Sequence, residues 1–144
     1  MNDQRRYPDR PYLAVSAAII RDRRVLLVRR AGGPGRGLFS LPGGVVELGE
    51  TLEEAVVREA SEETGLRIEP IALAGYRQYI SKDAQGRVER HYVILAFVAR
   101  AEDGEPVLNG ELAEYRWVEP REIEALSTTE GLAAIVKMAF ELLE

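Results

Sequence analysis

Short apolar runs separated by turn residues predict a series of β-strands in both halves of the chain. The predicted strands cover residues 13–20, 25–28, 38–41, 68–80, 87–100 and 115–118. Residues 21–23 turn the first strand into the second, and residues 83–86 (DAQG) have turn chemistry. The two long strands that flank this second turn are therefore expected to pair antiparallel.

One segment between these groups of strands combines signals for both ends of a helix. Thr51 followed by Glu54 forms the pattern of a capping box, which places the N-cap at Thr51. Gly65 suits the left-handed position that commonly follows the last helical residue. The sequence therefore predicts a helix from about residue 52 to residue 64.

The C-terminal part of the chain predicts two further helical segments. Pro120 suits the first position of a helix that continues over residues 121–126. A last helix is expected after a cap at Thr128 or Thr129. Its apolar side is formed by Leu132, Ile135, Val136, Ala139, Phe140 and Leu143.

Strands before, between and after two well-marked helices indicate an α/β or α+β sandwich. With 144 residues, the chain is long enough for one domain with a real core, and we expect a single domain over residues 1–144. The charged, proline-containing residues 1–11 are expected to form a flexible or loosely docked arm. Residues 31–37 (AGGPGRG) predict a loop, either a plain connector or a loop that closes on a substrate.

Composition and charge exclude several classes of function. The net charge is −5 and the pI is about 5.1, so nonspecific binding of nucleic acid is not expected. The absence of cysteine excludes disulfides and thiolate metal sites. The polar start has no apolar signal-peptide core, and no apolar run approaches membrane-spanning length. A cytoplasmic protein that binds neither nucleic acid nor a membrane is the simplest interpretation.

The strongest functional signal is a spaced set of charged residues and glycines over residues 44–66. These residues fit the pattern G-x5-E-x7-R-E-U-x-E-E-x-G-U, in which U is apolar. The fixed positions are Gly44, Glu50, Arg58, Glu59, Glu62, Glu63 and Gly65, with Ala60 and Leu66 in the apolar slots. A helix places the last three glutamates on one patch, where they repel one another unless a cation lies between them. Hard cations such as Mg²⁺ prefer oxygen ligands of this kind. Without the complete spacing, a solvated acidic helix would be the simpler explanation.

This pattern resembles the Nudix box, the signature of hydrolases that cleave a nucleoside diphosphate linked to another moiety. The order of predicted elements agrees with that family over essentially the whole chain. The resemblance implies an α/β/α sandwich with a mixed central sheet and with the box as a loop–helix–loop on one side. It also implies a Mg²⁺-dependent pyrophosphohydrolase, with Mn²⁺ as a second candidate metal and a small nucleotide as substrate. The family contains both dimers and monomers, so a homodimer stays an open alternative.

The resemblance further implies roles for individual residues. The groups expected to hold the metal are oxygen donors of the box, namely the Gly43 carbonyl and the carboxylates of Glu59, Glu62 and Glu63. Arg58 resembles the family arginine that orients a catalytic glutamate, and Glu50 resembles its structural partner.

In similar proteins, a glutamate from the loop before residues 115–118 completes the metal site or acts as general base. We favour Glu114, which directly precedes the Tyr-Arg-Trp strand, over Glu111 for this role. An exposed loop carboxylate is the alternative for either residue.

Several other residues are candidates for contacts with the substrate. Arg29 and Arg30 end the second strand, where a guanidinium is expected to bind phosphate unless both are ordinary strand-end arginines. Phe39, Tyr76 and Tyr79 are candidates for stacking on a purine, against the alternative that they belong to the core.

Three functional hypotheses follow from these motifs. The segments VLLVRR, GGPGRGLFSLPGG, HYVILAFVA and EYRWV resemble short bacterial ADP-ribose pyrophosphatase-like proteins, which would give AMP and ribose 5-phosphate. One departure is Lys82, which stands where ADP-ribose enzymes often carry a proline. The second hypothesis is a MutT-like nucleoside triphosphate pyrophosphohydrolase that releases pyrophosphate. The third is a domain that only binds a nucleotide and signals.

Overall fold

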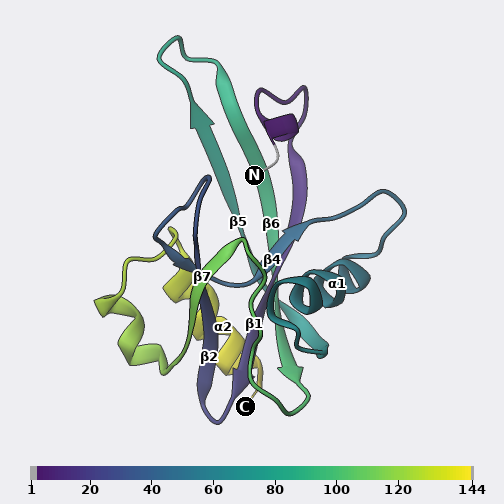
Figure 1. The fold of residues 1–144 in the computed structure, drawn as a ribbon, viewed down its shortest axis with the longest axis vertical. Helices are drawn as coiled ribbons and strands as arrows, with labels where there is room; N and C mark the ends of the chain where they lie inside the picture. The colour runs from purple at the N-terminus through teal and green to yellow at the C-terminus, as the bar shows by residue number, and fades with distance from the viewer. Residues whose placement is uncertain (1–2, 144) are drawn as a thin grey trace.

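A computed structural model describes residues 3–143 of the chain. Its centre is a seven-stranded sheet with helix α1 on one face and helix α2 on the other (Figure 1). The strands are β1 (Tyr12–Arg21), β2 (Arg24–Arg30), β3 (Phe39–Ser40), β4 (Gly43–Val45), β5 (Ile68–Lys82), β6 (Val88–Ala101) and β7 (Leu112–Val118). The helices are α1 (Leu52–Thr64), α2 (Leu132–Leu143) and the short 3-10 helices η1 (Asp3–Arg5) and η2 (Pro120–Ala125). None of the helices within residues 3–143 has the length and hydrophobicity of a membrane-spanning segment.

Strand β1 is the element at which the two halves of the sheet meet. It runs parallel to β6 over residues 12–19 and antiparallel to β2 and β4. Its end pairs with β2 through Ile20 and Arg21, whereas β4 pairs with residues 14–16. Strands β2 and β4 therefore pair with different parts of β1, and residues of both strands line a groove. The mixed sheet with a helix on each face confirms the fold class predicted from the sequence.

Alternating side chains of β1 build one hydrophobic layer on each face of the sheet. Ala17 and Ile19 pack in the layer that contains Val56 of α1, and Ala18 packs in the layer that contains Val136 of α2. Both valines are fully buried, and burial of one such side chain stabilises a fold by about 1.5–3 kcal/mol. This packing fixes α1 on the sheet, so that its acidic edge is held at the groove.

Most predicted elements are confirmed, but the prediction of the cap of the last helix is wrong. Helix α2 begins at Leu132 rather than directly after Thr128 or Thr129. Thr128 forms a β-bridge with Phe39, and the backbone N–H of Thr129 donates to the Phe39 carbonyl at 3.0 Å. The threonines therefore bind strand β3, a tertiary contact that local capping signals do not reveal.

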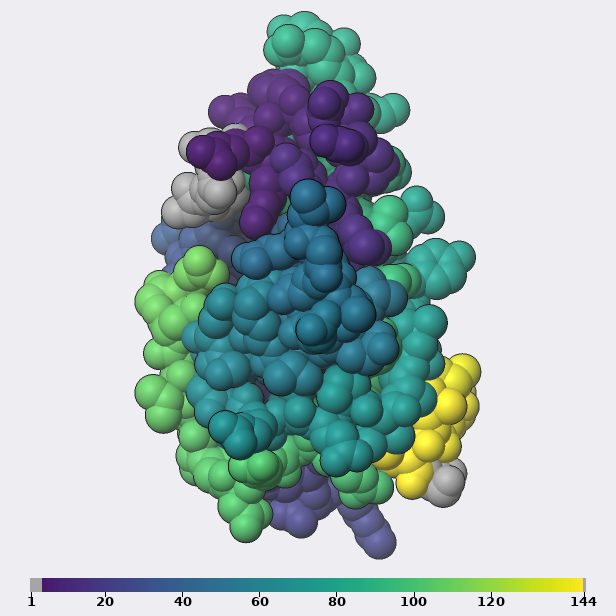
Figure 2. Space-filling model, turned by 90° about the vertical axis from the view of Figure 1, so that its right-hand side faces the viewer, coloured from purple at the N-terminus to yellow at the C-terminus, as the bar shows by residue number. Residues whose placement is uncertain are grey.

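The N-terminal segment lies beside the tip of the long β5–β6 hairpin (Figure 2). Its backbone is held there before β1 begins, since the Tyr7 N–H donates to the Glu89 carbonyl at 2.7 Å. Residues 1 and 2 of the predicted arm, and residue 144, lie outside the described residues. The flexibility of the arm stays a prediction.

Candidate active site

Helix α1 carries the predicted acidic patch, and local contacts fix both of its ends. The Thr51 hydroxyl accepts from the Glu54 N–H at 3.0 Å, and the Glu54 carboxylate accepts from the Thr51 N–H at 2.8 Å. At the other end, Gly65 is left-handed with φ 71°, and its N–H donates to the Ser61 carbonyl at 2.9 Å. The predicted capping box and terminal glycine are therefore confirmed, and they hold the glutamates of the motif in a fixed helical register.

The two glycines of β4 occupy positions where no side chain fits. A Cβ on Gly43 would lie 2.1 Å from the Val15 carbonyl oxygen, and one on Gly44 would lie 2.4 Å from the carboxyl carbon of Glu59. The Gly43 N–H also donates to Oε1 of Glu63 at 2.9 Å. The glycines thus let α1 approach the sheet closely, which brings two box carboxylates against the backbone of β4.

Arg58 joins the loop before α1 to the carboxylates on the helix. It binds Glu50 through two donors, with Nε at 2.6 Å and Nη2 at 2.9 Å from the carboxylate oxygens. Its Nη1 donates to Glu59 at 2.8 Å and lies 3.3 Å from a Glu62 oxygen, and its Nη2 donates to the Val45 carbonyl at 3.1 Å. Arg58 therefore orients Glu59, with Glu50 as the partner that holds the guanidinium in place.

Burial and charge give the box carboxylates very different acidities. Desolvation raises the pKa of Glu63, which is 3% exposed, to about 7, and the Glu59 charge adds to this rise against the Gly43 hydrogen bond. Desolvation also raises the pKa of Glu59, although Arg58 opposes the rise. Hydrogen bonds from Arg58 lower the pKa of Glu50 to about 2. The ionised forms of Glu59 and Glu63 are thus destabilised by their surroundings, whereas the ionised form of Glu50 is stabilised by Arg58.

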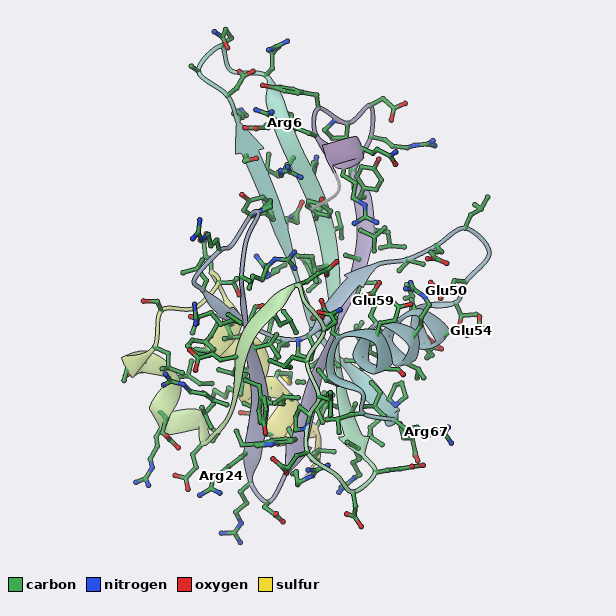
Figure 3. All side chains as sticks on the ribbon, in the orientation of Figure 1. Arg6, Arg24, Glu50, Glu54, Glu59 and Arg67 are labelled. Atoms are coloured by element: carbon green, nitrogen blue, oxygen red, sulfur yellow. The ribbon has the colours of Figure 1, made fainter. Side chains whose placement is uncertain are left out.

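The chemistry of this patch fits a hard divalent cation. Glu59, Glu62 and Glu63 offer oxygen donors only, which are the ligands that Mg²⁺ and Mn²⁺ prefer. Desolvation, with a smaller contribution from neighbouring carboxylate charges, raises the pKa values of Glu59 and Glu63, and a bound cation would stabilise both anions against these two effects. Within residues 3–143, no three acidic or histidine side chains are already gathered as a metal cluster. Glu59 is turned toward the sheet from α1 but bonded to Arg58 (Figure 3).

The two candidate glutamates near β7 lie in different surroundings. Glu114 faces Arg29 across the β2–β7 pair, and the hydrogen bond from Arg29 at 2.8 Å lowers the pKa of Glu114. Its side chain does not line the groove. Glu111 does line the groove, and its charge adds to the raised pKa values of Glu59 and Glu63. The structure thus brings Glu111, rather than the favoured Glu114, to the acidic patch.

The groove beside the patch has a volume of about 1250 Å³. Its lining includes positively charged side chains as well as the carboxylates. Arg30 lies on this groove, and its charge opposes the raised pKa of Glu63. Among the described residues, the buried Nε of Arg30 has no hydrogen-bond partner. Arg29 is instead engaged by Glu114 and does not line the groove. Of the two predicted phosphate-binding arginines, only Arg30 is placed to meet an anion beside the carboxylates.

The predicted stacking residues lie in three different environments. Tyr79 lines the groove, whereas Phe39 is 5% exposed, and Arg116 covers its ring at 5.0 Å from the centroid. Tyr76 is 66% exposed and does not line the groove. The structure therefore places Phe39 in the core and leaves Tyr79 as the predicted aromatic residue with access to a ligand.

The sequence analysis missed several groove residues. Tyr92 lies opposite Tyr79 in the β5–β6 pair, with ring centroids 6.4 Å apart, and Arg77 and Arg5 also line the groove. The predicted hairpin was the signal that could have paired Tyr79 with Tyr92. No local pattern points to Arg5, because its position depends on how the arm folds back.

Comparison with known proteins agrees with this geometry. The sequence profile of the NUDIX domain matches residues 10–138. An ADP-ribose pyrophosphatase of Methanocaldococcus jannaschii is 42% identical over 95 residues, which cover 66% of this chain and 54% of that protein. A protein of Mycobacterium tuberculosis named putative 8-oxo-dGTP diphosphatase 3 is 36% identical over 99 residues, which cover 68% of this chain and 45% of that protein. The crystal structure of a MutT NUDIX hydrolase from Burkholderia pseudomallei superimposes with a TM-score of 0.78 at 30% identity, covering 90% of this chain and 98% of that one.

The matched profile, the fold and the capped acidic helix identify the chain as a member of the NUDIX family. The chain spans about half the length of the first curated relatives that it matches, at 54% and 47% of their lengths.

Proposed function

We propose that this protein is a metal-dependent pyrophosphohydrolase that cleaves the diphosphate of a nucleoside diphosphate linked to another moiety. ADP-ribose or a related nucleotide sugar is the first candidate substrate. The observation that carries the proposal is the juxtaposition of Glu59 and Glu63 with Arg30 on one groove. This arrangement offers sites for a cation and for a phosphate side by side. The similarity to a relative named ADP-ribose pyrophosphatase supports the choice of substrate.

The box residues would hold Mg²⁺, or Mn²⁺, through Glu59, Glu62, Glu63 and the Gly43 carbonyl. When bound, such an ion neutralises phosphate charge and lowers the pKa of a coordinated water. Arg58 keeps Glu59 oriented, because its guanidinium is itself fixed by two hydrogen bonds to Glu50. Arg30 would bind a phosphate oxygen through the part of its guanidinium that lines the groove, and so orient the diphosphate.

A general base is the remaining requirement for attack by water. Glu111 lies on the groove with the box carboxylates, and no arginine within residues 3–143 is paired with its carboxylate. Glu114, the residue favoured from the sequence, would first have to leave Arg29. We therefore assign the proton-accepting role to Glu111, with Glu114 as a positioning residue for Arg29.

The assignment is tested by a product-resolved substrate screen with Mg²⁺ and with Mn²⁺. ADP-ribose is compared with (d)NTPs, including oxidised guanine nucleotides. Formation of AMP and ribose 5-phosphate at the highest kcat/KM is the expected result. No turnover of any diphosphate or triphosphate, with metal still bound, would refute the enzyme assignment and favour a nucleotide-binding domain.

A MutT-like activity on nucleoside triphosphates is the second candidate. It is favoured by the similarity to the relative named putative 8-oxo-dGTP diphosphatase 3. The same carboxylates and Arg30 would serve both reactions, so only the products distinguish them. Release of pyrophosphate and a nucleoside monophosphate would identify this activity.

A further inference from the structure

The N-terminal arm is attached to the turn of the β5–β6 hairpin by a set of specific contacts, which we call the latch. The Tyr7 N–H donates to the Glu89 carbonyl at 2.7 Å, and the Tyr7 hydroxyl donates to Oδ2 of Asp83 at 2.9 Å. Nε of Arg6 lies 2.6 Å from the Glu89 carboxylate, and the guanidinium of Arg87 lies 4.7 Å from the centroid of the Tyr7 ring. Figure 3 shows Arg6 between the arm and the two long strands. The arm thus contacts the hairpin through backbone, charge and aromatic interactions together.

The latch holds Tyr7 in a conformation that an aromatic residue rarely adopts. The φ angle of Tyr7 is 55°, in the left-handed region. This turn of the backbone sends the chain back along the hairpin. Arg5 precedes Tyr7 by two residues, and its guanidinium lies 5.9 Å from the centroid of the Tyr12 ring. Arg5 also lines the groove that contains the acidic patch.

Tyr12 belongs to a row of three tyrosines that crosses the sheet. The register pairs Tyr12 of β1 with Tyr92 of β6 and Tyr92 with Tyr79 of β5, which places the three side chains on one face. Their ring centroids are 6.0 Å apart for Tyr12 and Tyr92, and 6.4 Å apart for Tyr79 and Tyr92. Tyr79 and Tyr92 line the groove, as does Arg5, whose guanidinium contacts the Tyr12 end of the row. The far end of the groove therefore combines aromatic faces with a cation.

The tyrosine row lies well apart from the acidic patch. Ser16 of β1 pairs with Gly43, whose N–H holds Glu63, and Tyr12 is four residues earlier on the same strand. At about 3.4 Å per residue, Tyr12 and Ser16 are about 14 Å apart along β1, and the tyrosine row and the acidic patch are separated by about that distance. The groove has an acidic end for a metal-bound diphosphate and an aromatic, cationic end, which suits an elongated substrate with a planar group at one end.

We propose that the arm is a wall of the substrate groove: the latch holds Arg5 over the tyrosine row, where the two together bind the nucleobase of the substrate. A base stacks on the tyrosine faces, and the Arg5 guanidinium covers it or donates to its acceptor atoms. This inference rests on the proposed function for the identity of the ligand as a nucleotide. It assigns Arg5 as a specificity residue, and it assigns Tyr7 as a residue that positions Arg5.

The test measures binding of AMP, which carries a base, and of inorganic pyrophosphate, which does not, by calorimetry with Mg²⁺ present. The variants are Arg5→Gln, Tyr7→Phe and the control Arg10→Gln, since Arg10 is on the same arm but has an 83% exposed side chain. Arg5→Gln is expected to weaken AMP binding by about three- to thirtyfold, the range of a cation–π contact. Tyr7→Phe is expected to weaken it less, because only the bond to Asp83 is lost. Arg10→Gln and the affinity for pyrophosphate are expected to be unchanged.

Three results would overturn the inference. These are equal AMP affinities for Arg5→Gln and Arg10→Gln, an equal loss of affinity for AMP and pyrophosphate, and no AMP binding by the unaltered protein. Its failure is distinguishable from failure of the proposed function. If nucleotides are hydrolysed and Arg5→Gln does not change AMP binding, the inference alone is refuted. If AMP binding depends on Arg5 but no diphosphate or triphosphate is hydrolysed, the proposed function alone is refuted.

Discussion

The backbone N–H of Gly43 donates to the carboxylate of Glu63 at 2.9 Å, which joins the glycine strand β4 to the last turn of helix α1. The same carboxylate is buried to 3% exposure, and burial raises its pKa to about 7. The hydrogen bond from Gly43 thus holds the Glu63 carboxylate, whose ionised form is disfavoured by burial, at the edge of the groove. The proposed chemistry depends on this relationship, because it keeps an oxygen donor in place where a cation is needed.

Glu111→Gln and Glu114→Gln are predicted to have unequal effects on turnover. Loss of a general base commonly costs about 10²–10⁴ in rate, and we expect a loss of that size in kcat for Glu111→Gln. Glu114→Gln should leave kcat close to that of the unaltered protein, because Glu114 is paired with Arg29 outside the groove. Steady-state kinetics on the best substrate checks both variants. The reverse order of effects would restore Glu114 as the base.

Gly44→Ala is predicted to damage both stability and the site. A Cβ at this position would lie 2.4 Å from the Glu59 carboxyl carbon, so the carboxylate or the strand must move. Overpacking of this kind costs about 1–3 kcal/mol, and we expect a lower free energy of unfolding in urea together with weaker Mg²⁺ binding. Gly75→Ala is the matched control, since its Cβ would meet only Ile135 at 3.7 Å. Equal behaviour of the two variants would show that the close approach of Gly44 to Glu59 is unimportant.

Arg58→Lys is predicted to reduce activity with the fold retained. A lysine keeps the charge but cannot bind Glu50 through two donors and Glu59 through a third, as the guanidinium does. Loss of a residue that orients a ligand typically costs about 10–100-fold in metal affinity or activity, and we expect a fall within that range. Arg121→Lys serves as control, because its pair with Glu119 is exposed. Normal Mg²⁺ affinity and kcat in Arg58→Lys would remove the orienting role.

The Glu50–Arg58 pair is predicted to make stability depend on pH in the acid range. Hydrogen bonds from Arg58 lower the pKa of Glu50 from 4.5 to about 2, so the folded state binds this proton less readily than the unfolded state. The stabilisation is therefore complete above pH 4.5 and is lost as the pH falls toward 2. The unfolding free energy of Glu50→Gln should fall less steeply over this interval than that of the unaltered protein. Glu53→Gln, an exposed change on the first turn of α1, should follow the unaltered protein. Parallel curves for all three proteins would contradict the prediction.

The box helix could be predicted from the sequence because its determinants are local. Thr51, Glu54 and Gly65 fix the ends of α1 through contacts within a few residues, so spacing along the chain was sufficient. The choice between Glu111 and Glu114 was a different problem. It depends on the register of β2 with β7, which places Arg29 opposite Glu114, and neither strand encodes that register alone.

The far end of the groove depended even more on tertiary structure. The Tyr12–Tyr92 contact needs the parallel pairing of two strands about eighty positions apart in the chain, and Arg5 needs the arm to fold back onto the hairpin. Phe39 failed as a candidate ligand contact for the same reason, since its burial arises from packing against segments distant in sequence. Residue type alone does not separate a buried aromatic side chain from one that lines a groove.

The most direct test of the central claim is the Mg²⁺ dependence of ADP-ribose hydrolysis by the unaltered protein and by Glu63→Gln, with products resolved by chromatography. Loss of a metal ligand removes several kcal/mol of charge stabilisation, which corresponds to a fall in kcat of at least about a hundredfold. We expect that fall together with an unchanged circular dichroism spectrum and AMP and ribose 5-phosphate as the residual products. Near-normal turnover by Glu63→Gln at every Mg²⁺ concentration would contradict the assignment of the box carboxylates as the catalytic centre.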